Sequence, residues 1–367
     1  MSDRQFVSPQ THYHTLTEPF YLESGMVLEG VQIAYRTWGQ LNAKRDNAIV
    51  VCHALTGWAD ADDWWAPLFG SGQTFDPETD FILCPNVLGS CYGTTGPTSL
   101  NPSNEKPYSA DFPSITIRDM VHLQAVLLQA LSVDRIKLVM GGSMGGMQAL
   151  EWALLYPDWV GAIALIAVSG KHSAWCIGIS EAQRQAIYAD PNWQGGHYLP
   201  EQSPSAGLAA ARMMAMLTYR SWASFEAKFS RQQQEHTSDR PYEMVDYLHY
   251  QGQKLVERFD ANTYIALTHA MDTHDVARDR GEYTAVLSQI QQPALVVAID
   301  SDVLYPPVEQ QTLATHLPNA QFAWLHSTHG HDAFLIDMEA LNQLIITFRH
   351  QIQAGNGAFE PTSVCSA

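Results

Sequence analysis

A serine surrounded by glycines is the residue whose type and neighbours most clearly indicate chemistry. It lies in the run Gly141-Gly-Ser-Met-Gly-Gly-Met147, which contains the spacing Gly141-x-Ser143-x-Gly145. An apolar run precedes it at residues 136–140, and good helix formers follow it. A strand, a tight turn and a helix in this order form a nucleophile elbow, which exposes the serine hydroxyl at a helix N-terminus. We therefore predict that Ser143 is a nucleophile, the alternative being a glycine-rich turn with a capping serine.

A serine nucleophile needs a base and a carboxylate that orients the base. In an α/β sheet with an elbow, the two follow the serine in the order Asp, then His, after later strands. Asp302 follows a predicted strand at residues 294–299, and His331 follows another at 321–326. Active sites of open α/β sheets lie at this carboxyl edge. We predict Asp302 as the acid and His331 as the base. Neighbouring residues remain alternatives for these roles: Asp300, His326 and His329.

Backbone amides that stabilise an oxyanion are expected near the end of an earlier strand. The run Val50-Val-Cys-His-Ala-Leu-Thr-Gly57 has this position, so the amides of Leu55 and Met144 are the predicted pair. His53 is another imidazole in this run, but it precedes the nucleophile in the chain. We expect His53 to pack and hydrogen-bond beneath the loop.

The elements around these residues alternate between strand and helix. Short apolar runs in the first half of the chain predict buried strands at 47–52, 81–87, 136–140 and 162–168. Segments with helical spacing lie between them, at 114–131 and 144–156. This pattern predicts an α/β fold with a mostly parallel, doubly wound sheet. Residues 172–290 have helical periodicity and little that resembles a buried strand, and a closing helix is predicted at 335–352. We predict a core of residues 1–171 and 291–367 with a helical lid insertion at 172–290, although a separately folding domain would leave the same pattern.

Composition narrows the classes of partner and site. The 367 residues include 20 Lys plus Arg and 38 Asp plus Glu, so the formal charge is 20 − 38 = −18. This acidic balance argues against nucleic acid and anionic membranes, which attract basic patches. The scattered histidines lack metal-binding spacing, and we expect no metal site. The first 14 residues lack a signal-peptide pattern, and the cysteines are odd in number without CxxC spacing, which favours a cytoplasmic location. The cysteines are Cys52, Cys84, Cys91, Cys176 and Cys365.

Several longer motifs carry a resemblance to a known family. They run in the order His53-Ala-Leu-Thr-Gly57, Asn86-Val-Leu-Gly89, Gly93-Thr-Thr-Gly-Pro97, Asn101-Pro102, Ile115-Thr-Ile-Arg-Asp119, Gly142-Ser-Met-Gly-Gly146, Phe259-Asp-Ala-Asn-Thr-Tyr264 and Gly330-His-Asp-Ala-Phe-Leu335. From about residue 20 to 349 the chain resembles homoserine O-acyltransferases of the MetX type. The resemblance implies an α/β-hydrolase fold with a helical lid and a homodimer. It also implies ping-pong transfer of an acyl group from acyl-CoA to the hydroxyl of L-homoserine in methionine biosynthesis, without a cofactor.

The same resemblance implies roles for individual residues. Ser143, Asp302 and His331 match the family's triad. Arg212 matches the residue that holds the carboxylate of the amino acid, and Asp332 matches one that contacts substrate. A guanidinium suits a carboxylate, and a carboxylate suits an ammonium. Two further residues on the helix of Arg212 are expected at the same cleft, namely Tyr219 and Arg220.

The chain departs from the family pattern at three places that bear on substrate identity. Residues 58–65 resemble a branch that includes serine acyltransferases, and His269 stands where Arg or Lys is expected. Thr56 favours acetyl-CoA over succinyl-CoA as the donor. Homoserine O-acetyltransferase is the main prediction, with homoserine O-succinyltransferase and L-serine O-acyltransferase as alternatives. A carboxylesterase or thioesterase with the same triad is a more distant alternative, and a non-catalytic binding module leaves the triad unexplained.

Overall fold

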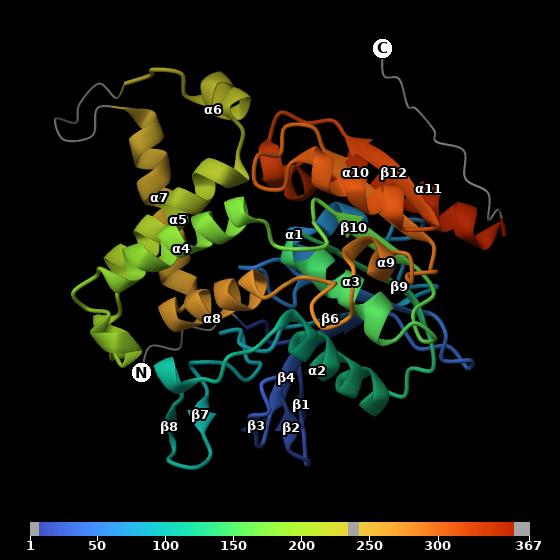
Figure 1. The fold of residues 1–367 in the computed structure, drawn as a ribbon, viewed down its shortest axis with the longest axis horizontal. Coiled ribbons are helices and arrows are strands. Elements are labelled where there is room, and N and C mark those ends of the chain that lie inside the picture. The colour runs from blue at the N-terminus through green and yellow to red at the C-terminus, as the bar shows by residue number, and fades with distance from the viewer. Residues whose placement is uncertain (1–6, 234–241, 356–367) are drawn as a thin grey trace.

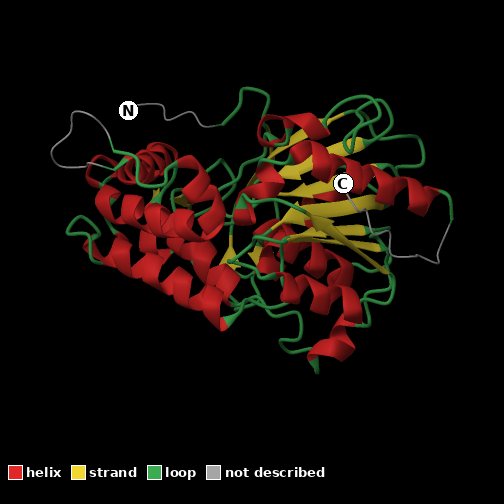
Figure 2. Ribbon diagram, turned by 90° about the horizontal axis from the view of Figure 1, so that it is seen from above, coloured by secondary structure: helices red, strands yellow, loops and turns green. Residues whose placement is uncertain are grey.

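The computed structural model describes residues 7–233 and 242–355. Its centre is an eight-stranded sheet (Figures 1 and 2). In spatial order the strands are β1 (His12–Thr15), β4 (Gln32–Trp38), β6 (Phe81–Pro85), β5 (Ala48–Cys52), β9 (Ile136–Gly142), β10 (Ile163–Ile166), β11 (Ala294–Ile299) and β12 (Ala320–Leu325). The six strands from β6 to β12 in this order are parallel, whereas β1 and β4 are antiparallel to their neighbours. The predicted mostly parallel α/β sheet is therefore confirmed.

Two antiparallel strands at one end of the sheet, β1 and β4, lie outside the predicted strands. Residues 32–38 mix buried and more exposed side chains and include Arg36, so they lack the continuous apolar run of a central strand. Short hairpins also lie outside the main sheet: β2 (Phe20–Tyr21) with β3 (Val27–Leu28), and β7 (Leu100–Asn101) with β8 (Lys106–Pro107).

Successive residues of the central strand β5 enter two different hydrophobic cores. Val50 and Cys52 pack in the core that contains helices α2 (Ile117–Ala130) and α3 (Met144–Leu155). Ile49 and Val51 pack on the opposite face with α11 (Met338–Gln353). Because side chains alternate across a strand, a sheet covered on both faces needs strands that are apolar throughout. The remaining core helices are α1 (Ala61–Trp64), α9 (Tyr283–Leu287) and α10 (Pro307–His316).

A group of helices lies beside the sheet, between β10 and β11 in the chain (Figure 2). It comprises α4 (Ala174–Tyr188), α5 (Ser205–Tyr219), α6 (Trp222–Lys228), α7 (Glu243–Arg258) and α8 (Ala261–Asp272). Helix α5 packs against both α4 and α7, and α8 packs against α4, whereas α9 packs against α10 of the core. We call helices α4 to α8 the lid helices.

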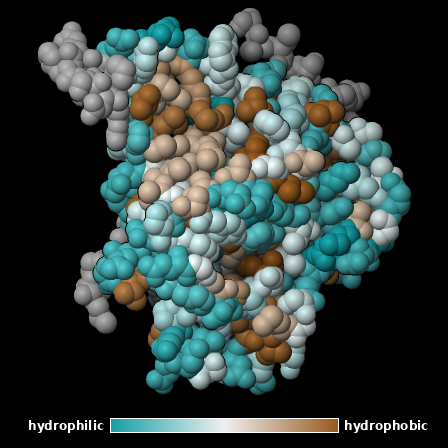
Figure 3. Space-filling model, turned by 60° about the vertical axis from the view of Figure 1, so that its left-hand side comes forward, coloured by the Kyte–Doolittle hydropathy of each residue, from teal (hydrophilic) through white to brown (hydrophobic). Residues whose placement is uncertain are grey.

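The surface of the lid helices mixes polar and apolar side chains, and Figure 3 shows apolar residues gathered in the upper half of one face. Large exposed apolar side chains on these helices are Trp175, Ile177, Met214, Leu217, Trp222 and Tyr250. Within residues 7–233 and 242–355, no helix is both long and apolar enough to cross a membrane. Four cysteines are free thiols, and Cys365 lies outside the described residues.

Candidate active site

Ser143 occupies a strained turn between β9 and α3. Its backbone has φ 57° and ψ −124°, a region that residues other than glycine rarely adopt. The Ser143 amide donates a hydrogen bond to the carbonyl of Ile166 at 3.0 Å, which ties the turn to the neighbouring strand β10. The strain is therefore held by the sheet, as a nucleophile elbow requires.

The glycines around Ser143 are required by close backbone contacts. A Cβ atom on Gly145 would lie 2.0 Å from the carbonyl oxygen of Cys52, and one on Gly141 would lie 2.5 Å from the same oxygen. A Cβ on Gly142 would meet the ring of Phe334 at 2.7 Å. These contacts bring the elbow directly against the end of β5, where the chain continues toward Leu55.

Asp302 and His331 form a buried pair at the carboxyl edge of the sheet. The Nδ1 atom of His331 lies 2.6 Å from Oδ2 of Asp302. The other carboxylate oxygen, Oδ1, accepts the amides of Leu304 at 2.8 Å and Tyr305 at 2.9 Å. The backbone thus fixes the carboxylate, and the carboxylate fixes the imidazole with Nε2 directed away from Asp302.

The alternative acid and bases occupy other positions. His326 and Asp300 form their own hydrogen bond at 3.0 Å, with side chains that are 60% and 43% exposed. His329 is bonded through Nδ1 to the guanidinium of Arg220 at 3.1 Å. None of the three lines the cavity that contains Ser143.

One small cavity, which we call the serine cavity, brings most of the predicted site residues together. Its volume is about 110 Å³. The lining residues are Ala54, Leu55, Thr56, Ser143, Arg212, Tyr219, His331, Asp332, Phe334 and Leu335. The Nε2 atom of His331 is buried without a hydrogen-bond partner among the described residues. Ser143 and His331 thus share the cavity without a hydrogen bond between them, and such bonds are often long before substrate binds.

The surroundings of His331 favour its protonated form. Burial lowers the pKa of the imidazole, but the charge of Asp302 and its hydrogen bond, together with the charge of Asp332, raise the pKa above its ordinary value. Aromatic rings hold the imidazole in place, with centroids at 5.3 Å for Tyr305 and 5.6 Å for Phe334. The site can therefore stabilise the imidazolium that forms when His331 accepts a proton.

Leu55 and Met144 present unused backbone amides. Neither amide donates a hydrogen bond within the part of the chain that the structure describes. Met144 begins helix α3, whose first amides have no helical partner. Leu55 lies in a turn from Ala54 to Gly57, which is closed by a 2.8 Å hydrogen bond from the Gly57 amide to the Ala54 carbonyl. Both groups have the chemistry of an oxyanion hole.

His53 has a structural position beneath this turn, as expected. Its Nδ1 donates to the carbonyl of Ala54 at 2.9 Å, and its Nε2 accepts the amide of Val87 at 3.2 Å. Burial lowers the pKa of His53 to about 4, although the hydrogen bond to Ala54 acts in the opposite direction. The ring is therefore neutral at physiological pH and has no free nitrogen for catalysis.

Arg212 and Asp332 place opposite charges at the serine cavity. The guanidinium of Arg212 lies 5.3 Å from the ring centre of Tyr219 and makes no hydrogen bond or ion pair with any described residue. Burial raises the pKa of Asp332, while the charges of Arg212, His331 and Arg220 lower it, with a net increase. The cavity therefore contains a cation available for a carboxylate and an acid group next to the imidazole.

Some contacts of the site were not predicted. The ring of Tyr305 packs on His331, and Ser221 donates to the backbone of the loop at residues 328–329. Arg220, which was expected at the cleft of Arg212, instead binds His329 and does not line the serine cavity. The position of Tyr305 three residues after Asp302 is the only sequence signal for its role. In residues 7–233 and 242–355, no group of three or more His, Cys, Asp or Glu side chains could hold a metal ion.

The chain is similar in fold to both acetyltransferases and esterases. A family model described as alpha/beta hydrolase fold matches residues 47–337. The homoserine O-acetyltransferase of Nostoc punctiforme is 67% identical over 345 residues, which cover 93% of this chain and 96% of that protein. The crystal structure of homoserine O-acetyltransferase from Bacillus anthracis has a TM-score of 0.85 at 26% identity and covers 92% of this chain and 97% of that one. An esterase crystal structure has the same TM-score at 27% identity, covering 92% and 99%. The backbone fold therefore does not separate transferases from esterases, whereas the sequence identity favours the transferases.

Proposed function

This chain is an acyltransferase of the homoserine O-acetyltransferase family within the α/β hydrolases, and from that premise we propose that it transfers acetyl from acetyl-CoA to the hydroxyl of L-homoserine. The reaction is ping-pong and passes through an acetyl ester of Ser143. Acetyl-CoA is a co-substrate, and no cofactor is needed. The product belongs to methionine biosynthesis.

In the first half-reaction, Nε2 of His331 accepts the proton of Ser143 while the serine oxygen attacks the thioester carbonyl carbon. The negative charge on the carbonyl oxygen is stabilised by the amides of Leu55 and Met144. Asp302 keeps the imidazole oriented and stabilises its positive charge. The carbon–sulfur bond then breaks, and CoA leaves as a thiol with the proton from His331.

In the second half-reaction, His331 accepts the proton of the homoserine hydroxyl, whose oxygen attacks the ester carbonyl carbon. The same two amides stabilise the second oxyanion. The bond between the acetyl group and Ser143 breaks, and His331 returns the proton to the serine. Transfer outcompetes hydrolysis when homoserine occupies the serine cavity in place of water.

The guanidinium of Arg212 is the observation that most directly supports an amino acid as the acyl acceptor. It lines the same cavity as Ser143, and no described residue neutralises it through an ion pair. A substrate carboxylate would supply that partner, and Asp332 would bind the ammonium group. Ester hydrolysis requires neither group. The esterase with the same fold makes hydrolysis the second candidate.

Thiol release from acetyl-CoA or succinyl-CoA tests the proposal when purified protein is assayed with L-homoserine, L-serine or no acceptor. We expect release that depends on acetyl-CoA and L-homoserine and disappears in Ser143→Ala. Equal release without an acceptor would identify a hydrolase, and preference for L-serine or succinyl-CoA would replace the proposed acceptor or donor.

Two further expectations belong to this proposal. The cysteine pattern favours the cytoplasm, and the family resemblance implies a homodimer. The exposed apolar side chains of the lid helices offer a surface for such a dimer. Analytical ultracentrifugation of the purified chain measures the oligomeric state directly.

A further inference from the structure

Arg258, the last residue of α7, connects the lid helices to the turn that carries Leu55. Its Nη1 atom donates a hydrogen bond to the carbonyl oxygen of Thr56 at 2.8 Å. The same atom donates to the hydroxyl of Tyr92, and the guanidinium carbon lies 5.2 Å from the ring centre of Trp58. A charged residue that comes 202 positions later in the chain therefore reaches the oxyanion turn.

The hydrogen bonds to the carbonyls of Ala54 and Thr56 in this turn come from different parts of the molecule. The Ala54 carbonyl accepts the amide of Gly57 and Nδ1 of His53, both of which belong to the same loop. The Thr56 carbonyl has Arg258 as its hydrogen-bond donor, and no other described residue donates to it. Hydrogen bonds from a charged donor are about twice as strong as neutral ones. The position of the Thr56 peptide thus depends on the lid.

We propose that Arg258 is a positioning residue that holds the Leu55 amide in place for the oxyanion. This inference rests on the proposed function, because it assumes that Leu55 stabilises the oxyanion in acyl transfer. The donor must lie within about 2.7–3.1 Å of the oxygen that becomes charged, and a displacement of about 1 Å can cost about 100-fold in rate. The Thr56 carbonyl shares a peptide unit with the Gly57 amide, which donates to the Ala54 carbonyl. The Ala54 carbonyl in turn shares a peptide unit with the Leu55 amide, so the contact of Arg258 reaches Leu55 through these two peptide units.

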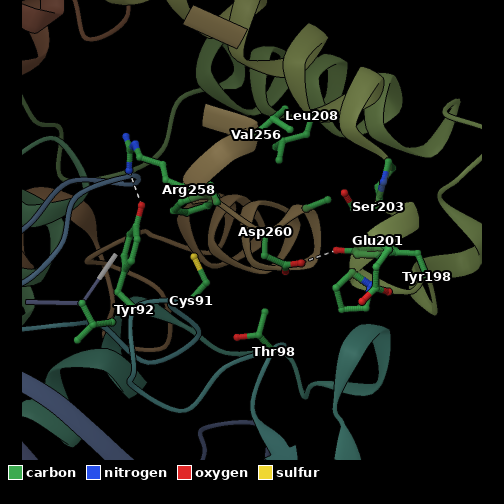
Figure 4. Close-up of a pocket in the computed structure, with 15 residues that line it drawn as sticks. Cys91, Tyr92, Thr98, Tyr198, Glu201, Ser203, Leu208, Val256, Arg258 and Asp260 are labelled. Carbon is green, nitrogen blue, oxygen red and sulfur yellow. Dashed lines mark hydrogen bonds between the residues drawn. The ribbon is translucent and has the colours of Figure 1, made fainter. Parts of the chain in front are cut away.

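A larger cavity lies on the other side of Arg258. Its volume is about 460 Å³, its lining combines the loop at Cys91 and Tyr92 with residues of α5, α7 and α8, and it shares no lining residue with the serine cavity. In Figure 4 the guanidinium of Arg258 points toward Tyr92 and away from lining residues such as Leu208 and Glu201. Removal of this side chain would therefore leave space that a free guanidinium ion can enter from the cavity.

The test compares Arg258→Met with Lys254→Met. Lys254 is exposed, lies one turn earlier on α7 and stacks on Tyr250 at 5.4 Å, so its loss removes a charge from the same helix without touching the turn. For Arg258→Met we expect kcat to fall about 10- to 100-fold, with the KM for homoserine within about twofold of wild type. The same fall should occur in the acylation of Ser143 by p-nitrophenyl acetate. Lys254→Met should match wild type in both assays.

Chemical rescue separates positioning from a merely structural role. Millimolar guanidinium should restore part of the activity of Arg258→Ala and leave wild type and Lys254→Met unchanged. A variant with a lower melting temperature but unchanged kcat, or a kcat loss that guanidinium does not reverse, would overturn the inference. If Arg258→Met does not fold, Arg258→Lys replaces it in the test. Lysine keeps one charged donor, so this variant should have an intermediate kcat. A kcat equal to wild type in Arg258→Lys would also overturn the inference.

The p-nitrophenyl acetate assay keeps this inference distinct from the proposed function. If wild type acylates Ser143 but does not transfer acetyl to homoserine, the proposed function fails while the effect of Arg258 on acylation is still measured. If wild type transfers acetyl and Arg258→Met does so equally well, only the inference about Arg258 fails.

Discussion

Replacement of Asp302 by asparagine should inactivate the enzyme without unfolding it. The position of Oδ1 is fixed by two backbone amides, from Leu304 at 2.8 Å and Tyr305 at 2.9 Å. Both amides need an acceptor, so the side-chain oxygen of the introduced asparagine would take this place and its NH₂ group would face Nδ1 of His331. That nitrogen would then have to accept a hydrogen bond, which leaves the proton of the neutral ring on Nε2.

Such a tautomer cannot accept the proton of Ser143. The expected loss in kcat is about 10³- to 10⁴-fold, equivalent to about 4–5.5 kcal/mol in the activation free energy. The melting temperature should change little, because the three hydrogen bonds of residue 302 keep their geometry. Acetyl transfer is measured by thiol release, and unfolding by circular dichroism.

Asp300→Asn is the matched control. Asp300 precedes Asp302 by two residues and also pairs with a histidine, but that pair is exposed and outside the serine cavity. Its kcat should remain within about twofold of wild type, because the contact is exposed and does not touch the serine cavity. An inactive Asp300→Asn together with an active Asp302→Asn would refute the assignment of the acid and the argument from the two amides.

Arg212→Met should raise the KM for homoserine about 10- to 100-fold, because a charge-assisted contact contributes about 1.5–3 kcal/mol, while acylation by p-nitrophenyl acetate stays near wild type; an unchanged KM would exclude the carboxylate contact. Gly145→Ala should lower the free energy of unfolding by about 3 kcal/mol or more, since its Cβ would lie 2.0 Å from the backbone oxygen of Cys52. Gly178→Ala, in open space on α4, should instead stabilise by about 0.5–1 kcal/mol in the same thermal unfolding assay. The base His331 must be neutral and its pKa is raised above 6.5, so kcat/KM should be lost as the pH falls through a value above 6.5, and a midpoint below it would contradict this argument.

The sequence predicted the central strands and the elbow because both depend on local patterns. Apolar runs identify strands that are covered on both faces, and strand β11 has the predicted bounds, residues 294–299. The glycines around Ser143 indicate that another backbone segment lies close to this turn, although the sequence does not identify that segment. The antiparallel strands β1 and β4 carry a weaker pattern, because several of their side chains are exposed or only partly buried.

Tertiary structure decided which residues meet. Asp300 and Asp302 follow the same strand, and three histidines follow the next, so spacing alone left several pairs open. Burial distinguishes them, because Asp302 and His331 point into the protein while Asp300 and His326 pair at the surface. The contact between Arg258 and Thr56 joins the lid to the core across 202 residues. Local sequence pattern fixes the conformation of each segment, but the direction of a side chain at a loop is set by packing against segments that are distant in the chain.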